Sequence, residues 1–87
     1  MRAVAATFLA HDPDPASARA LVKATSDKDW MVRAAAVEAI AQRGDASLLP
    51  SVEIKFSDRN AKVRYSAAAA VIRLSMIGEI KTPKNDP

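Results

Sequence analysis

Residues 26–45 read SDKDWMVRAAAVEAIAQRGD, and this stretch decides the fold because much of the chain repeats it. Residues 57–76 read SDRNAKVRYSAAAAVIRLSM, which keeps the order of a polar turn followed by small apolar residues. Residues 1–14 read MRAVAATFLAHDPD and match the second half of the same stretch. Internal similarity at a fixed spacing is typical of stacked-repeat proteins, in which each unit packs only against its neighbours.

The spacing of the repeats is constant along the chain. Arg2, Arg33 and Arg64 share one position of the alignment and are 31 residues apart (33 − 2 = 31 and 64 − 33 = 31). Asp27 and Asp58 share another position. This period predicts an all-α fold, an α-solenoid of antiparallel helical hairpins with about two and a half repeats and five helices.

The composition narrows the class of protein. Alanine dominates the hydrophobic residues and only four residues are aromatic, so we expect a thin core. The chain has no cysteine, which excludes disulfides, thiolate metal sites and a cysteine nucleophile. No apolar run approaches the roughly 20 residues of a membrane span, and the N-terminus lacks a signal-peptide layout, so we expect no membrane association and favour a cytoplasmic location. The net charge of +3 is spread along the chain, and nucleic acid is not an expected partner.

Turn and capping residues divide the chain into helices. Asp14 before Pro15, Asp29 and Asn60 are expected N-caps, and Gly44 is the expected left-handed residue after the third helix. Asp45 or Ser47 opens the fourth helix, and Gly78 ends the fifth. The five helices are expected at residues 1–10, 15–25, 30–43, 46–56 and 61–77. They make up a solenoid over residues 1–78, with a half repeat at 1–14, repeats at 15–44 and 45–78, and a loose tail at 79–87.

Hydrophobic spacing indicates which side of each helix faces the core. The residues expected to face inward are Ala20, Leu21 and Ala24 on the second helix, Val32, Ala36, Ala39 and Ile40 on the third, and Val63, Ala67, Ala70, Val71 and Leu74 on the fifth.

The pattern of residues 26–45 resembles the HEAT repeat, and more closely the short bacterial class named after phycobilisome lyase subunits. The second copy keeps the aspartate, valine and arginine but has Leu74, Ser75 and Met76 in place of Arg-Gly-Asp, which suggests a final repeat. The chain is thus interpreted as the C-terminal end of a longer array. The resemblance implies that the second helices line a concave side and that the fold binds other proteins, and it implies no chemistry.

Two interpretations apply to the aspartate and arginine columns, which comprise Asp27, Arg33, Asp58 and Arg64. In the functional one, the arginines bind phosphate or acidic side chains. In the structural one, each aspartate closes its turn and accepts from an arginine of its own or the next repeat. We favour the structural ladder, because a binding site rarely needs the same residue in every repeat.

A protein or peptide is the expected partner, and the expected contact residues lie on the second helices. Trp30 either packs as a staple against the preceding helix or serves as an exposed anchor. If the chain binds a protein, Trp30, Met31, Tyr65 and Arg73 should cluster on one accessible surface. The full set of candidate partner-binding residues is Trp30, Met31, Glu38, Lys62, Tyr65 and Arg73.

No catalytic set is present, so we expect no enzyme activity and no cofactor. His11 is a lone histidine without other ligands at metal-binding spacing. Two alternatives to a binding module remain. The chain is a structural cap that self-associates through an open first helix, exposing Ala3, Val4 and Phe8. Or, by resemblance, it is an accessory subunit of a phycobilin-lyase-like enzyme or a relative of repeat-containing DNA glycosylases.

Overall fold

The structure is a computed structural model that describes the backbone of residues 2–81 and the side chains of residues 5–79. Within these residues the chain forms five α-helices and two short 3-10 segments. In chain order they are α1 (Arg2–Ala10), α2 (Pro15–Ala24), α3 (Trp30–Arg43), η1 (Ala46–Leu48), α4 (Leu49–Glu53), η2 (Ile54–Ser57) and α5 (Ala61–Lys81).

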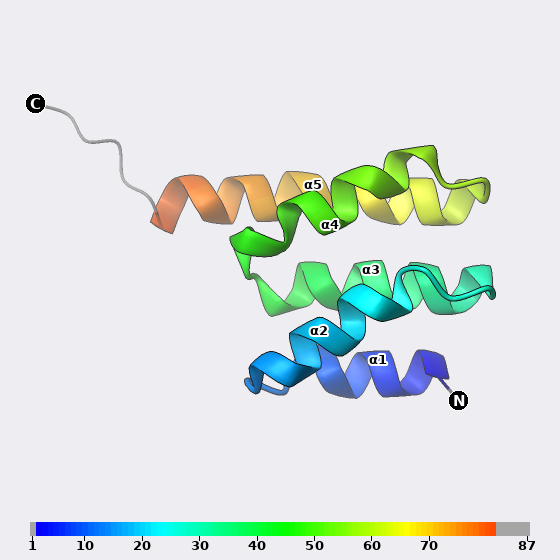
Figure 1. The fold of residues 1–87 in the computed structure, drawn as a ribbon. Helices are drawn as coiled ribbons and strands as arrows, with labels where there is room; N and C mark the ends of the chain where they lie inside the picture. The colour runs from blue at the N-terminus through cyan, green and yellow to red at the C-terminus, as the bar shows by residue number, and fades with distance from the viewer. Residues whose placement is uncertain (1, 82–87) are drawn as a thin grey trace, which may run out of the picture.

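The helices form two layers. In Figure 1, α1, α3 and α5 lie side by side in one layer, while α2 and α4 lie across them in the other. The central helix α3 packs against α1 and α2 on one side and against α5 on the other. α2 pairs with α3, and the segment from η1 to η2 pairs with α5, so each pair is one helical hairpin. The predicted all-α stack of hairpins is therefore confirmed.

Small side chains dominate the core, as the composition predicts. Ala36 of α3 and Ala67 and Ala70 of α5 are fully enclosed, and short side chains let helix axes approach closely. The larger fully enclosed side chains are Leu21, Val37, Ile40, Val52, Val63 and Leu74. Most residues expected to face inward do so, but Ala20 is exposed. Ser17, four residues before Leu21, is buried on that side of α2 instead.

Side-chain caps set the helix starts. Asp14 accepts from the N–H of Ala16 at 2.9 Å, with Pro15 as the first helical residue, and Asp29 accepts from Met31 at 2.9 Å. Asn60 accepts from the N–H of Lys62 at 2.8 Å. Gly44 ends α3 with a φ of 71°, in the left-handed region that glycine occupies without strain.

The fourth helix differs from the expected single segment at 46–56. Asp45 is its cap, accepting from the N–H of Ser47 at 3.0 Å and from its hydroxyl at 2.7 Å. A helix that began there would place the ring of Pro50 against the carbonyl of Ala46. The first three residues instead form the 3-10 turn η1, and α4 starts at Leu49.

The fifth helix is longer than expected. It was expected to end before Gly78, but it passes through this glycine and ends at Lys81. Residues 79–81 of the expected tail are therefore helical, and residues 82–87 lie outside the described part of the chain. A Cβ added at Gly78 would meet the Cβ of Ala46 at 3.4 Å. Gly78 thus marks a close approach of α5 to η1 rather than a helix end.

Candidate interaction site

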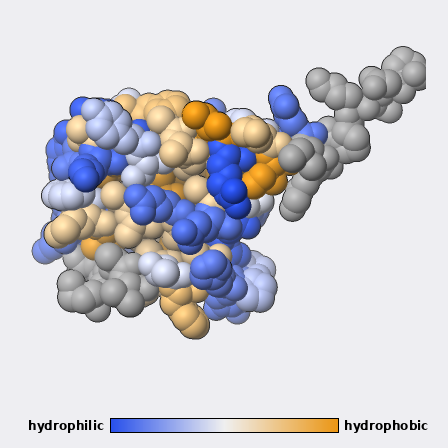
Figure 2. Space-filling model, turned by 180° about the vertical axis from the view of Figure 1, so that it is seen from behind, coloured by the Kyte–Doolittle hydropathy of each residue, from blue (hydrophilic) through white to orange (hydrophobic). Residues whose placement is uncertain are grey.

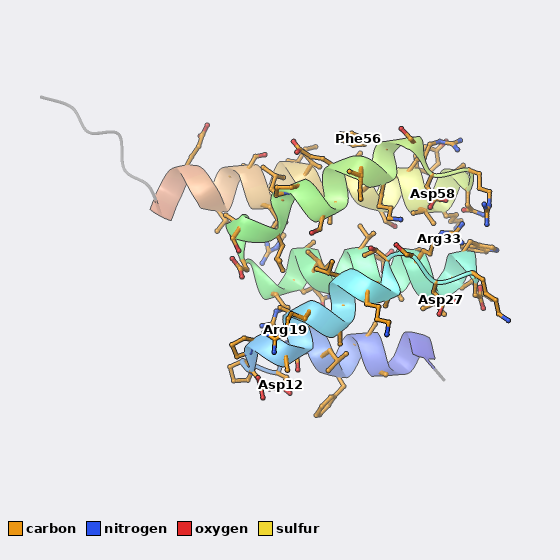
Figure 3. The ribbon with its side chains drawn as sticks, viewed as in Figure 1. Asp12, Arg19, Asp27, Arg33, Phe56 and Asp58 are labelled. Carbon is orange, nitrogen blue, oxygen red and sulfur yellow. The ribbon has the colours of Figure 1, made fainter. Side chains whose placement is uncertain are left out.

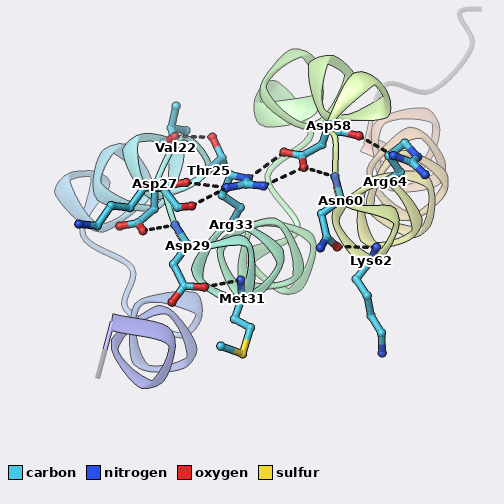
Figure 4. A network of polar contacts seen from close by, with 11 residues as sticks. Val22, Thr25, Asp27, Asp29, Met31, Arg33, Asp58, Asn60, Lys62 and Arg64 are labelled. Atoms are coloured by element: carbon cyan, nitrogen blue, oxygen red, sulfur yellow. Dashed lines mark hydrogen bonds and ion pairs between the residues drawn. The ribbon is translucent and has the colours of Figure 1, made fainter.

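The aspartate and arginine columns meet where the two hairpins join. Arg33 of α3 donates from Nε to Asp58 Oδ2 at 2.9 Å and from Nη2 to Oδ1 at 3.0 Å, which is a bidentate ion pair. Its Nη1 donates to the carbonyls of Asp27 at 2.9 Å and Lys28 at 3.1 Å (Figure 4). Arg33 thus binds the turn of its own repeat and the turn of the next.

This ion pair is buried, and each partner shifts the pKa of the other. Arg33 is only 5% exposed. The hydrogen bonds that Arg33 donates to Asp58 raise the pKa of Arg33 against the effect of burial. The guanidinium in turn holds the pKa of Asp58 below its usual value, helped by the N–H of Asn60, which donates to Oδ1 at 2.9 Å. Four of the five N–H groups of Arg33 donate to protein acceptors and the side chain is buried, so this arginine is poorly placed to bind a phosphate ligand.

A second set of arginines caps the ends of the preceding helices. Arg43 donates from Nη1 to the carbonyl of Leu9 at 2.9 Å and also to that of Asp12. Arg73 donates from Nε to the carbonyl of Ala41 at 2.7 Å. Cations at helix C-termini satisfy unpaired carbonyls and the helix dipole. Sequence reasoning assigned Arg73 to partner binding and did not identify this role of Arg43.

The exposed side of α5 holds a shallow groove. It has a volume of about 370 Å³ and is lined by Ala69, Ile72, Arg73, Met76 and Ile77. Ile72 is 62% exposed and Met76, one turn later, is also exposed. Figure 2 shows hydrophobic colours along the upper edge of the molecule, where α5 runs. Ile72 and Met76 were not predicted, although their spacing of four residues on the outer side of a helix was the available signal.

The predicted partner-binding residues lie at both ends of the layer that α1, α3 and α5 form. Trp30 and Met31 are exposed at the start of α3. Arg73 lies beside Ala41, eleven residues after Trp30, or about 16 Å further along the helix. The expected single cluster of Trp30, Met31, Tyr65 and Arg73 is therefore spread along two helices. Trp30 is 38% exposed, which is more than a packed staple requires and less than an exposed anchor would show.

The two remaining candidates lie on α3 and at the start of α5. Glu38 accepts from the hydroxyl of Ser66 at 3.1 Å. The side chain of Lys62 is exposed on the same side of α5 as Arg73, three helical turns earlier. Lys62 and Arg73 therefore place two cations along the side of α5 that contains the groove.

Tyr65 lies elsewhere than expected. It repeats the position of Ala34, which is 8% exposed because the following helix covers it. Tyr65, in the last helix of the described chain, is 72% exposed at that position. Tyr65 therefore lies at the end of the stack, at the edge of the surface that α3 and α5 form.

At the other end of the stack, Phe8 of α1 is exposed. Its counterparts Ala39 and Ala70 are buried by the preceding helix. Ala3 and Val4, which were expected to lie open beside it, have side chains outside the described set. Among the described residues, no three His, Cys, Asp or Glu side chains are placed to bind a metal ion. None of the described helices combines the length and the apolar character that crossing a membrane requires.

Comparison with known proteins identifies a family. The family model described as HEAT repeats matches residues 1–84 of the chain. No curated protein matches it. HEAT repeats generally mediate protein–protein interaction or scaffolding.

Proposed function

The chain belongs to the HEAT-repeat family, and from this premise we propose that it is a protein-interaction module that binds a segment of another protein through the exposed side of α5. The observation that supports this site is the groove lined by Ala69, Ile72, Arg73, Met76 and Ile77. Large apolar side chains around a concave surface, with a cation at its edge, are typical of a protein-binding site.

The chemistry of the groove indicates the kind of segment it takes. Ile72 and Met76 supply apolar area, and each fully covered side chain of this size contributes about 1.5–3 kcal/mol. Arg73 is held by the carbonyl of Ala41 through Nε, and in the described chain its two Nη groups make no hydrogen bond. Lys62 adds a second cation on the same side of the helix. We therefore expect an apolar segment flanked by carboxylates.

A matched pair of isoleucines tests this proposal. Ile72 on α5 is 62% exposed and Ile54 on η2, in the other layer, is 67% exposed. Affinity-tagged wild-type, Ile72→Asp and Ile54→Asp chains are each used to recover proteins from cells that express the chain. We expect partners retained by the wild type and Ile54→Asp to be lost with Ile72→Asp. Equal recovery by both variants would contradict the proposal.

A structural role for the N-terminal side is the second candidate, and exposed Phe8 supports it. Its side chain is large where both other repeats have a covered alanine, and a second molecule that covered it would remove a large apolar area from water. Sedimentation velocity over a range of concentrations measures this self-association, which Phe8→Ser should weaken. A wild type that stays monomeric at high concentration would exclude it.

The closer resemblance to phycobilisome lyase subunits, and the accessory role that it suggests, stay predictions from the sequence. The interpretation of the chain as the C-terminal end of a longer array also stays a prediction, and so does its self-association through the first helix.

A further inference from the structure

Arg64 repeats the position of Arg33 but lacks a carboxylate. Each arginine donates from Nη1 to a carbonyl six residues earlier, Arg33 to Asp27 at 2.9 Å and Arg64 to Asp58 at 2.7 Å. Nε and Nη2 of Arg33 then hold Asp58 of the next hairpin. In the part of the chain that the structure describes, Nε and Nη2 of Arg64 have no hydrogen-bond or ion-pair partner. Figure 4 shows Arg64 on the far side of Asp58 from Arg33.

The surroundings of Arg64 are those of a repeat that no further hairpin covers in the described residues. Ala34 and Val37 of α3 are buried because α5 covers them, whereas their counterparts Tyr65 and Ala68 are exposed. The same holds in the other layer, where buried Thr25 corresponds to Phe56, which is 48% exposed. Figure 3 places Phe56 at the upper edge of the molecule, beyond α4. We call Phe56, Arg64, Tyr65 and Ala68 the end face.

We infer that the end face docks a helical hairpin of a partner protein, and that an aspartate in the turn of this hairpin binds Nε and Nη2 of Arg64. The internal pair of Arg33 with Asp58 is the template for this contact. The bond to the Asp58 carbonyl already fixes the guanidinium of Arg64, so little side-chain freedom is lost when a carboxylate binds. The inference goes beyond the proposed function, because its polar contact is made by Arg64 near the start of α5, whereas the groove lies further along the helix at residues 69–77.

Two features make the end face selective for such a hairpin. Tyr65 is far larger than its counterpart Ala34, so the docked hairpin needs small side chains opposite it. A second copy of this chain is not the expected occupant, because Arg33 already holds its Asp58 and α1 already packs against the hairpin of α2 and α3 that carries its Asp27. The partner must therefore bring a turn aspartate that no arginine of its own occupies.

An in-register duplication tests the docking directly. A copy of residues 44–74 inserted after Leu74 supplies one more hairpin and places a copy of Asp58 opposite Arg64. The folding equilibria of the original and extended chains are measured by urea denaturation, with and without Arg64→Glu. We expect Arg64→Glu to lower the folding equilibrium constant of the extended chain at least about tenfold more than that of the original chain.

Matched variants separate the contact from general effects of charge. Lys62→Glu changes an exposed cation on the same helix outside the end face, and it should act equally in both chains. Replacing the copy of Asp58 by arginine in the Arg64→Glu background should restore most of the loss in the extended chain. Equal effects of Arg64→Glu in both chains would overturn the inference, even if the added hairpin folds. Self-association of the original chain that Arg64→Glu abolishes would overturn it too, because the occupant would then be a second copy.

Discussion

Arg33 is the residue that ties one repeat to the next. It is almost fully buried, it makes four hydrogen bonds, and two of them go to a single carboxylate. A buried charge is tolerated when it is paired and its donors are satisfied, and removing one partner leaves the other charge uncompensated. The period of the sequence identified this arginine and Asp58. It did not show whether the pair forms within one repeat or between two, because a period gives position along the chain and not the neighbour in space.

Loss of the Asp58 carboxylate should therefore destabilise the folded chain. We expect Asp58→Ala to lower the free energy of unfolding by about 3 kcal/mol, because it leaves the guanidinium of Arg33 buried without its anion. Arg59→Ala removes an exposed charge from the adjacent position and should change the stability by less than about 0.5 kcal/mol. Urea denaturation of the three chains measures both effects. Equal losses for the two variants would show that the pair is not a structural link.

The lowered pKa of Asp58 gives this contribution a pH dependence. Arg33 lowers the pKa in the folded chain, so the unfolded chain binds more protons as the pH falls, and stability rises with pH across that range. The contribution is complete above the unfolded pKa of about 3.9 and is lost as the pH falls through the folded pKa. We expect the difference in Tm between the wild type and Asp58→Asn to be constant from about pH 7 to pH 5 and to shrink below about pH 4. A difference that stays constant down to about pH 2 would contradict this.

At the scale of elements, most helix bounds follow from local chemistry. The third helix has the predicted limits, because an aspartate cap begins it and a left-handed glycine ends it. Pro50 indicated that a regular helix capped by Asp45 would be disrupted, but only the structure shows that a 3-10 turn comes before α4 instead. The helix end predicted at Gly78 was wrong, because a glycine that ends a helix and a glycine that lets two segments approach cannot be told apart in a single sequence. Helical spacing alone did not show that Tyr65 lies on the side of α5 that no further hairpin covers in the described residues.

Replacing each of the two glycines by alanine should change the free energy of unfolding in opposite directions. Gly44→Ala puts a Cβ on a residue with a φ of 71° and within 3.4 Å of Ile77 Cδ1, so it should lower the free energy of unfolding by about 1 kcal/mol or more. Gly78→Ala replaces a helical glycine and meets only Ala46, at 3.4 Å, so it should leave the stability unchanged or raise it by up to about 1 kcal/mol. Thermal unfolding followed by circular dichroism compares them. A loss of stability in Gly78→Ala as large as that in Gly44→Ala would contradict the assignment.

At the scale of the whole molecule, the described residues form a short stack with an exposed side at each end. Among the described helices, α3 alone has a helix of its own layer on both sides, whereas α1 and α5 each have one. Phe8 is exposed at one end, and Phe56 and Tyr65 are exposed at the other. In a stack of this kind stability comes from contacts between adjacent units, so it should be graded along the chain and not uniform. The period of the sequence predicts this architecture, but the accessible groove on α5 depends on side-chain packing that the period does not specify.

Native-state hydrogen exchange, resolved by residue, tests the stack most directly. If each hairpin packs only against adjacent units, the amides of α3 should have the highest opening free energy, and those of α1 should exchange by local opening at a lower free energy. Asp58→Ala should reduce this opening free energy most at the junction between α3 and α5. Equal opening free energies for α1, α3 and α5, all matching the global free energy of unfolding, would indicate one common core and contradict the stack.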